Sequence, residues 1–572
     1  MPGRSSSGDQ RVAVVTGGGG GIGAAIAEEL GRLGHFVVTM DPLVSLDGAT
    51  RVPAAPETTA DRIRAAGGSA RASSVSVTDG VAVEELFAML VAEHGRLDAV
   101  INVAGITRPT TFATGRDEDW CAVLEVHLEG YLNILRAALP IMAAAGHGSI
   151  LGVTSGSGWR PADTGAYGCA KRAVAALTWE LGAVTPPGVV VNAVSPIAVT
   201  RMVTAALERR ARGGGGVPKP DSSASATGGL SLGSMPAPDE LGPLGAHLVG
   251  DAFSWCRGQV VFAAGSEVAV VDRPHLLEAV RIADVPSVAR VLGAVTTSAL
   301  ARAEEGQESR GGSNPRFGGI FDEGPAGERP TAAATACVVV SDRPDVASAV
   351  GAALGGRGVT THPIESSAAT TTFASAAAAL RSVVEAVGPI DAVVVALASG
   401  TAPPSSTGWE AVLAEHAGIV DHIHIDAGWA RAVADHVAGT DRALRLVTLT
   451  DATTAGGRSR AQAAAQLARA AKKATGDRVS AFAVSVETTD GMEALGEVVA
   501  HLVTAPEAAA LCGAELAVGP GWFGLRSHPR PRGTVTFGGP AVPGWLDGAL
   551  RSIVGVDDAG VDGRASLREE AR

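Results

Sequence analysis

The sequence predicts an α/β protein with two tandem domains, each built on a doubly wound parallel sheet. Three observations predict this fold class. The chain has 572 residues, which is about four times the length of an ordinary domain. Short β-branched runs alternate with longer segments rich in Ala, Leu and Glu, as in the strand–helix units of a parallel sheet. Segments of the first half also recur, in the same order, in the second half.

The first half begins with a strand–helix–strand pattern. Apolar runs at 12–15 and 36–39 are expected to be the first two strands, and 24–33 between them has a helical composition. Gly34 follows that segment, where a helix-ending glycine is favoured. Further strands are expected at 99–101, 149–153 and 189–191, and longer helices at 117–144 and 166–181.

Two polar, glycine-rich stretches interrupt the pattern. Residues 212–238 have little to bury and are expected to form a flexible loop, and 303–329 is the better candidate for an interdomain linker. The expected division is a flexible N-terminus at 1–10, a cofactor-binding domain at 11–300, a linker at 301–332, a second domain at 333–535 and a C-terminal tail at 536–572.

The second half repeats features of the first. Gly95–Val100 is echoed by Gly388–Val393, and Trp120–His127 by Trp409–His416. Chance resemblance in a chain rich in Ala and Val is the alternative explanation. Strands are expected at 337–340, 392–395 and 444–449, and a helix at 345–354.

Composition and charge exclude several classes of protein. The formal net charge of −13 argues against binding to nucleic acid or to anionic membranes. No apolar run is long enough to span a membrane, and the first residues lack the apolar core of a signal peptide, so a cytoplasmic location is expected. The five cysteines form no C-x-x-C pair, which predicts neither disulfides nor a metal site.

A glycine cluster lies between the first strand and the first helix. Thr16-Gly17-Gly18-Gly19-Gly20-Gly21-Ile22-Gly23 stands where the pyrophosphate of a dinucleotide approaches the backbone and a helix N-terminus. Asp41 ends the next strand, and a carboxylate there accepts hydrogen bonds from ribose hydroxyls and repels a 2′-phosphate, which favours NAD over NADP. A simple turn residue before Pro42 is the alternative interpretation of Asp41.

The segment Tyr167-Gly168-Cys169-Ala170-Lys171 is the sharpest catalytic signal. Residues four apart lie on one face of a helix, so the ammonium of Lys171 can lower the pKa of the Tyr167 phenol and make it a proton donor or acceptor. With only two tyrosines in the chain, an ordinary surface helix is a less favoured explanation. Ser155 follows a predicted strand and can hold a substrate carbonyl oxygen, with Ser157 as the competing choice.

Further motifs accompany these residues, namely Asn102-Val103-Ala104-Gly105 and Asn192-Ala193-Val194-Ser195-Pro196 with Thr200. Together they resemble the short-chain dehydrogenase/reductase family over residues 11 to about 270. The resemblance implies a Rossmann-type fold that binds a nicotinamide cofactor. It implies cofactor contacts from Thr16, Gly17, Gly21, Ile22, Gly23, Asp41, Val77, Asn102, Ala104, Gly105, Tyr167, Lys171, Pro196 and Thr200.

One branch of the family is especially similar, the dehydrogenases of the type 2 multifunctional β-oxidation enzymes. Most of the family has Asn where His127 stands, in a proton relay from the lysine through water, and this branch commonly has His. The sequence departs from the family pattern in a Ser155–Tyr167 interval that is one residue short, in Ile197 for Gly, and in Ser76 for Asp.

The second half resembles a degenerate copy of the same fold. Ser341-Asp342-Arg343-Pro344 replaces the glycines, Gln462-x-x-x-Gln466 occupies the Tyr-x-x-x-Lys region, and no tyrosine follows residue 167. Family members pair through the two helices that correspond to 117–144 and 166–181. We therefore expect 409–437 and 458–473 to form that partner surface within one chain, as an internal pseudo-dimer that can form further homo-oligomers.

The predicted function is NAD-dependent hydride transfer between a secondary alcohol and a ketone, by Ser155, Tyr167, Lys171 and His127, without a metal. The branch resemblance extends the substrate to a 3-hydroxyacyl thioester, whose coenzyme A phosphates Arg160 or Arg201 could meet, although ordinary surface arginines are the favoured interpretation of both. The alternatives are a non-catalytic NAD-binding or scaffolding protein and an NADPH-dependent ketoreductase.

Overall fold

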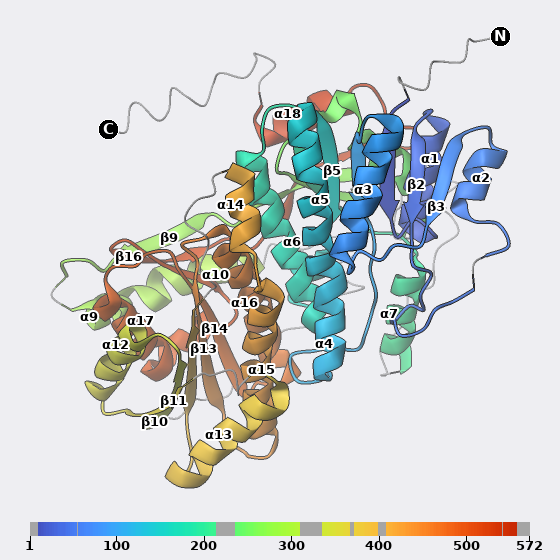
Figure 1. Ribbon diagram of the computed structural model, residues 1–572. Helices are drawn as coiled ribbons and strands as arrows, with labels where there is room; N and C mark the ends of the chain where they lie inside the picture. The colour runs from blue at the N-terminus through green and yellow to red at the C-terminus, as the bar shows by residue number, and fades with distance from the viewer. Residues whose placement is uncertain are drawn as a thin grey trace.

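The computed structural model describes residues 10–53, 55–212, 235–285, 287–308, 334–365, 371–398, 408–539 and 541–556. Two sheets with flanking helices stand side by side (Figure 1). The α/β fold class with two tandem parallel-sheet units is therefore confirmed. The expected loop at 212–238 and the expected N-terminus at 1–10 lie largely outside the described residues, as does the part of the expected C-terminal tail after residue 556.

The first sheet has nine strands in the order β17-β8-β7-β6-β5-β4-β1-β2-β3. The strands from β3 to β7 are parallel, whereas β8 pairs with β7 and β17 in antiparallel fashion. The order reverses between β1 and β4, which is where parallel sheets of this type bind ligands. The strands are β1 (Val12–Thr16), β2 (Phe36–Met40), β3 (Ser69–Ser73), β4 (Ala99–Asn102), β5 (Gly148–Val153), β6 (Val189–Pro196), β7 (Val260–Ala264), β8 (Glu267–Asp272) and β17 (Arg530–Thr536).

The helices of the first half follow the predicted strand–helix alternation. The segment predicted as one helix at 117–144 consists of α4, a π-helical turn η1 and α5 in direct succession. The helices are α1 (Gly21–Arg32), α2 (Thr59–Ala65), α3 (Gly80–His94), α4 (Asp117–Leu124), η1 (Glu125–Glu129), α5 (Gly130–Ala145), α6 (Gly165–Val184), α7 (Arg201–Arg212) and α8 (Gly242–His247).

The second sheet has eight strands in the order β11-β10-β12-β13-β14-β15-β16-β9 and repeats the pattern of the first. Its strands are parallel from β11 to β15, then antiparallel. The strands are β9 (Leu276–Arg281), β10 (Ala336–Ser341), β11 (Thr360–Glu365), β12 (Ala392–Leu397), β13 (Leu444–Asp451), β14 (Val479–Val486), β15 (Glu515–Gly519) and β16 (Trp522–Arg526). The helices are α9 (Val288–Val295), α10 (Ala301–Glu308), α12 (Pro344–Gly355), α13 (Phe373–Val387), α14 (Gly408–Glu415), α15 (Ile419–Ala438), α16 (Ala455–Ala474), α17 (Met492–Thr504) and α18 (Leu546–Val554).

The two halves exchange their last strands. The β9 strand follows the strands of the first sheet in the chain but pairs with β16 of the second sheet. Conversely, β17 follows the strands of the second sheet but pairs with β8 of the first. Where the two crossing segments meet, the amide of Ser527 donates to the carbonyl of His275 over 2.8 Å. Sheet membership therefore departs from the boundaries expected at 300 and 535, because an edge strand pairs with whichever free edge lies beside it in space.

Packing follows the same exchange. Leu292 of α9 and Leu300 lie in the hydrophobic core of the second half, and residues 301–308, expected in the linker, form α10. Leu546 and Leu550 of α18, expected in the tail, pack in the core of the first half, and α18 lies over that half in Figure 1.

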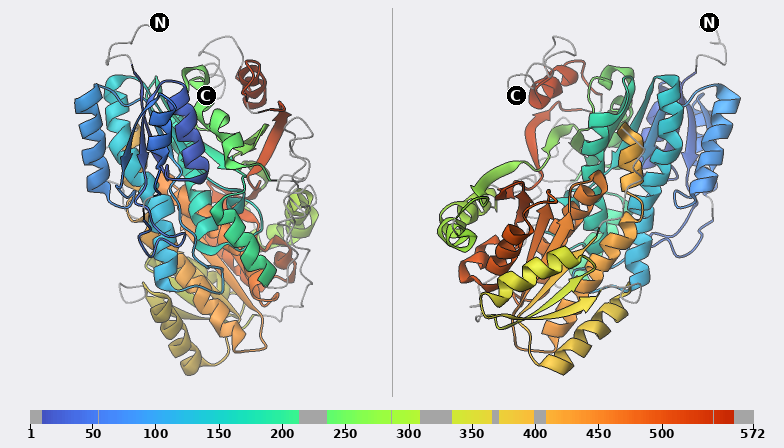
Figure 2. Two further views of the ribbon diagram at one scale, coloured as in Figure 1. Left: turned by 90° about the vertical axis from the view of Figure 1, so that its right-hand side faces the viewer. Right: turned by 60° about the vertical axis from the view of Figure 1, so that its left-hand side comes forward.

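The halves meet through α6 and α16. Most of the buried apolar residues of these two helices belong to one hydrophobic cluster, which also contains residues of both sheets. Figure 2 shows the teal helices of the first half beside the orange helices of the second in both views. The guanidinium of Arg458 donates to Glu180 across this contact over 2.7 Å. The expected partner segments 409–437 and 458–473 thus lie in α14, α15 and α16, and α14 and α16 both contact α6.

Candidate active site

The glycine loop joins β1 to α1 and presents bare backbone to the carboxyl edge of the sheet. Gly17 and Gly21 have φ angles of +63° and +55°, which side-chain-bearing residues rarely adopt. A Cβ on Gly23 would stand 2.3 Å from the carbonyl oxygen of Gly17. The N-cap residue Gly20 provides no side-chain hydrogen bond to the first N–H groups of α1. This loop fits the pyrophosphate of a dinucleotide.

Asp41 lies against the glycine loop. Its Oδ2 accepts a hydrogen bond from the amide of Gly19 over 3.0 Å, and its Oδ1 accepts one from the amide of Leu43 over 2.9 Å. The two bonds hold the carboxylate beside the loop, so Asp41 does more than begin the turn before Pro42. A negative charge at this position disfavours a 2′-phosphate.

The Asn102–Gly105 segment is tied to the glycine loop through Thr16. The hydroxyl of Thr16 donates to Oδ1 of Asn102 over 2.8 Å and accepts from the amide of Ala104 over 3.0 Å. A Cβ on Gly17 would lie 3.0 Å from Ala104, and a Cβ on Gly105 would lie 2.5 Å from the ring of His127. The segment therefore fills the space between the glycine loop and His127.

The remaining predicted cofactor residues lie around this centre. The carbonyl of Val77 accepts a hydrogen bond from Asn133 over 3.0 Å, and Ile22 packs on the core behind the loop. Pro196 ends β6. Thr200 lies 3.8 Å from the position of a Cβ on Gly21.

Arg201 begins α7, next to the glycine loop. Its guanidinium lies 3.8 Å from the position of a Cβ on Gly20. We expected Arg201 to meet a substrate phosphate or to be an ordinary surface residue. The residue is exposed beside the glycine loop, which agrees with a surface arginine.

Ser155, Tyr167 and Lys171 lie together at the ends of β5 and α6. The hydroxyl of Ser155 is hydrogen-bonded to the phenol of Tyr167 and accepts from the amide of Ser157 over 3.2 Å. The ammonium of Lys171 donates to the carbonyl of Val153 over 2.6 Å and lies 5.8 Å from the ring of Tyr167. Of the two candidate serines, Ser155 is therefore the one in contact with the phenol.

Burial controls the charges of this cluster. It raises the pKa of the Tyr167 phenol, opposed by the hydrogen bond from Ser155 and by the positive charge of Arg160. It also lowers the pKa of Lys171 to about 7. We expected Lys171 alone to supply the charge that acts on the phenol, and Arg160 was missed in this role. The only signal for Arg160 was its place between Ser155 and Tyr167.

His127 lies in the π-helical turn η1, and such turns are common at functional sites. Its Nε2 lies 2.8 Å from the carbonyl oxygen of Ile106, and its ring meets that of Tyr167 edge-on. Burial and the charge of Lys171 lower the pKa of this imidazole well below its ordinary value. The ring is therefore neutral near neutral pH.

The second half is built differently at the corresponding edge. Asp342 follows β10, and its carboxylate accepts a hydrogen bond from the amide of Ala398 over 2.8 Å. Arg460 of α16 donates to the carbonyls of Leu397 and Ala398, at the end of β12, and pairs with Asp426. An aspartate and a proline at the start of α12 oppose phosphate binding there.

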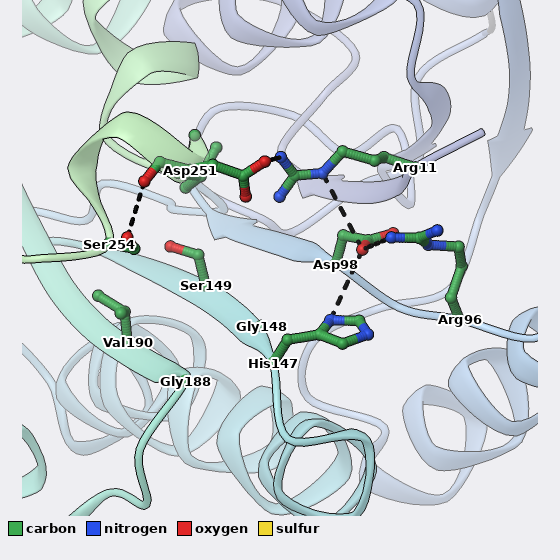
Figure 3. Close-up of a pocket in the computed structure, with 12 residues that line it drawn as sticks. Arg11, Arg96, Asp98, His147, Gly148, Ser149, Gly188, Val190, Asp251 and Ser254 are labelled. Carbon is green, nitrogen blue, oxygen red and sulfur yellow. Dashed lines mark hydrogen bonds and ion pairs between the residues drawn. The ribbon is translucent and has the colours of Figure 1, made fainter. Parts of the chain in front are cut away.

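Other features of the molecule lie apart from this site. A cavity of about 300 Å³ opens at the opposite edge of the first sheet, where Arg11 pairs with Asp251 and Arg96 with Asp98 (Figure 3).

Among the described residues, no group of His, Cys, Asp or Glu is arranged to hold a metal ion. None of the described helices is long and apolar enough to cross a bilayer.

Comparisons with known proteins give the family. Residues 11–211 match the family model of the short chain dehydrogenases. The chain is 38% identical over 202 residues to the short-chain reductase protein NovJ of Streptomyces niveus, covering 35% of this chain and 74% of that protein. It is 34% identical over 280 residues to the hydroxyacyl-CoA dehydrogenase ChsB1 of Mycobacterium tuberculosis, covering 46% of this chain and 81% of that protein.

Larger relatives and a solved structure also match. The peroxisomal hydratase-dehydrogenase-epimerase of Neurospora crassa is 33% identical, over 34% of this chain but only 22% of its own length. The crystal structure of a short chain dehydrogenase from Mycobacterium avium superposes with a TM-score of 0.40 and 29% identity, over 51% of this chain and 95% of that one. The predicted family is confirmed: this chain belongs to the short-chain dehydrogenases/reductases and is an oxidoreductase similar to the dehydrogenase part of the peroxisomal multifunctional enzymes.

Proposed function

We propose that the protein interconverts a secondary alcohol and a ketone by NAD-dependent hydride transfer in its first half. The observation that carries this proposal is the placement of the Tyr167 phenol. It lies between the hydroxyl of Ser155 and the ring of His127, at the same edge of the sheet as the glycine loop. Proton transfer and cofactor binding thus share one edge.

Different residues would bind different parts of the dinucleotide. The glycine loop and the start of α1 would hold the pyrophosphate, and Asp41 would accept hydrogen bonds from the adenosine ribose. The bound nicotinamide supplies the hydride chemistry. Lys171 has donors to spare after its bond to Val153, and they can reach ribose hydroxyls.

The protein groups supply position and proton transfer. Ser155 orients the substrate oxygen, and the phenol of Tyr167 gives a proton to that oxygen or takes one from it. Arg160 and Ser155 both favour the phenolate that remains when the proton has left. Burial disfavours the charged ring of His127, so this imidazole can relay a proton only by releasing one from one ring nitrogen as it accepts one at the other.

A 3-hydroxyacyl thioester is the proposed substrate class. Relatives named for hydroxyacyl-CoA dehydrogenation and for the peroxisomal multifunctional enzymes support this choice. The second half contributes no second active centre, because it has no tyrosine and closes the corresponding edge with Arg460 and Asp342.

Titration and one pair of variants test the function. Calorimetric titration of the full chain is expected to give one NADH site per chain and weaker NADPH binding. Tyr167→Phe should lower turnover of a 3-hydroxyacyl-CoA by about 10²-fold or more, the size of a lost acid–base group, with NADH affinity kept. The matched control is Tyr131→Phe, which alters the other tyrosine of the chain, a fully buried one. Full turnover by Tyr167→Phe would refute the proposal, and two NADH sites would refute the inactive second half.

A further inference from the structure

The chain between Ser155 and Tyr167 is held by a residue of the second half. Gln466 of α16 is 3% exposed. Its side-chain nitrogen donates to the carbonyls of Ser157 and Arg160 over 3.0 Å each, and to that of Ala162 over 3.2 Å. An amide nitrogen has two hydrogens, so one bond is shared between two acceptors. We call residues 156–164 the Ser–Tyr loop.

A glycine makes this approach possible. A Cβ on Gly168, the neighbour of Tyr167, would lie 3.2 Å from Cγ of Gln466 and 3.0 Å from the carbonyl oxygen of Ser157. Arg469, almost one turn further along α16, donates to the carbonyl of Trp159 in the same loop. Side chains of α16 therefore reach several backbone carbonyls of the Ser–Tyr loop.

The other end of the Gln466 amide is also occupied. Its Oε1 accepts a hydrogen bond of 3.2 Å from Arg172, which follows Lys171 on α6. Arg172 is 1% exposed and forms an ion pair with Glu515 of β15. Gln466 is thus fixed in rotation, with its acceptor toward α6 and its donor toward the Ser–Tyr loop.

We propose that Gln466 is a positioning residue for the active site. By satisfying the loop carbonyls, it holds the loop so that Ser155 stays against the Tyr167 phenol. The carbonyls of Arg160 and Ala162 also accept from the backbone amides of Ala162 and Thr164, so the loss of the Gln466 amide falls on the carbonyl of Ser157. A carbonyl left without a donor is costly, so the loop would rearrange at Ser157. The inference rests on the proposed function of Ser155 and Tyr167, and it gives the inactive half a role in the chemistry of the active one.

The test uses two glutamines on the same helix. Gln466→Met keeps the length and bulk of the side chain but removes its donor to the loop and its acceptor for Arg172. Gln462→Met is the matched control, because Gln462 accepts from Arg172 over 2.9 Å and donates to Glu515 over 2.9 Å, on the α6 side of the contact. Gln466→Met should lower kcat about tenfold or more beyond the effect of Gln462→Met, with the NADH dissociation constant changed less than about twofold.

A second measurement does not depend on turnover. Hydrogen–deuterium exchange of the full chain should show faster exchange at the amides of the Ser–Tyr loop in Gln466→Met than in Gln462→Met. Equal exchange and equal kcat in the two variants would overturn the proposal. A third outcome is faster loop exchange in Gln466→Met together with a wild-type chain that turns over no 3-hydroxyacyl-CoA. This outcome would show that Gln466 holds the Ser–Tyr loop, but it would refute both the role of Gln466 in catalysis and the proposed function.

Discussion

The imidazole ring of His127 meets the phenol ring of Tyr167 edge-on, with 5.0 Å between the ring centroids and 86° between the ring planes. This edge-to-face geometry is favourable for aromatic pairs. It also places a neutral ring that can form hydrogen bonds beside the phenol. His127 can therefore fix the position of the phenol as well as take part in proton transfer.

The first prediction concerns His127. His127→Leu introduces an apolar side chain of similar size and removes the ring contact and the hydrogen bond to Ile106. We expect kcat to fall by about 10–100-fold, with NADH affinity almost unchanged, because the loss affects proton transfer rather than cofactor binding. His127→Asn, which restores a polar group, should recover part of kcat. Steady-state kinetics and titration with NADH check this, and unchanged kcat in His127→Leu would remove His127 from the mechanism.

The second prediction concerns pH and Lys171. Burial lowers the pKa of Lys171 from 10.5 to about 7, so between these values the unfolded chain holds a proton that the folded chain has lost. Unfolding therefore takes up a proton, and the free energy of unfolding should rise with pH in this window, by at most about 1.4 kcal/mol per pH unit.

Lys171→Met should remove that rise. Urea unfolding between pH 7 and about 9.5 measures the slope for the wild type and for Lys171→Met. Lys472→Met, which alters a half-buried lysine at the end of α16, should keep the wild-type slope. Parallel slopes for the wild type and Lys171→Met would show that Lys171 keeps its proton in the folded chain.

The third prediction concerns the choice of cofactor. Asp41→Asn keeps the shape of the side chain and an oxygen that can accept from Gly19, but it removes the charge that repels a 2′-phosphate. The ratio of NADPH to NADH dissociation constants should fall by about tenfold. Asp47→Asn, in the same region, is the control, since Asp47 bonds to Ser45 and Ala49 and not to the glycine loop. If both variants leave the ratio of dissociation constants unchanged, residues other than Asp41 determine the choice between NADH and NADPH.

The fourth prediction concerns the buried ion pair of Arg172 and Glu515, which joins the two halves. Arg172→Met leaves the carboxylate of Glu515 buried without this partner and should lower the free energy of unfolding by about 3–5 kcal/mol. The double variant Arg172→Met/Glu515→Gln should be more stable than Arg172→Met, because no charge is left unpaired. Chemical unfolding of the two single variants and the double variant measures the coupling. Additive losses would contradict a direct pair.

The local arrangement of the site could be predicted from the sequence. The glycine loop, Asp41 and the Tyr167–Lys171 spacing belong to single strand–turn–helix units, so their geometry depends on residues close together in the chain. The order of strands in the parallel sheets follows from the same units. These are the parts of the molecule in which local pattern and final structure agree.

Contacts between distant segments could not be predicted. The hydrogen bond from Gln466 to Ser157 joins residues 309 apart, and no local pattern distinguishes this glutamine from Gln462. The exchange of β9 and β17 depends on which free sheet edges lie side by side, which strand propensity does not encode. Arg160 acts on Tyr167 only because the loop between them is folded back. Each case depends on tertiary packing.

The exchanged strands also set the order in which the chain can fold on the ribosome. One edge of β8 has no partner until β17 has been made, and β17 ends at Thr536. Until Thr536 has been made, the outer edge of β8 is therefore open, and another nascent chain could add a strand to it. A prematurely terminated chain would keep every predicted catalytic residue and still expose this edge. Loss of the last strand should thus lead to aggregation before it leads to loss of chemistry.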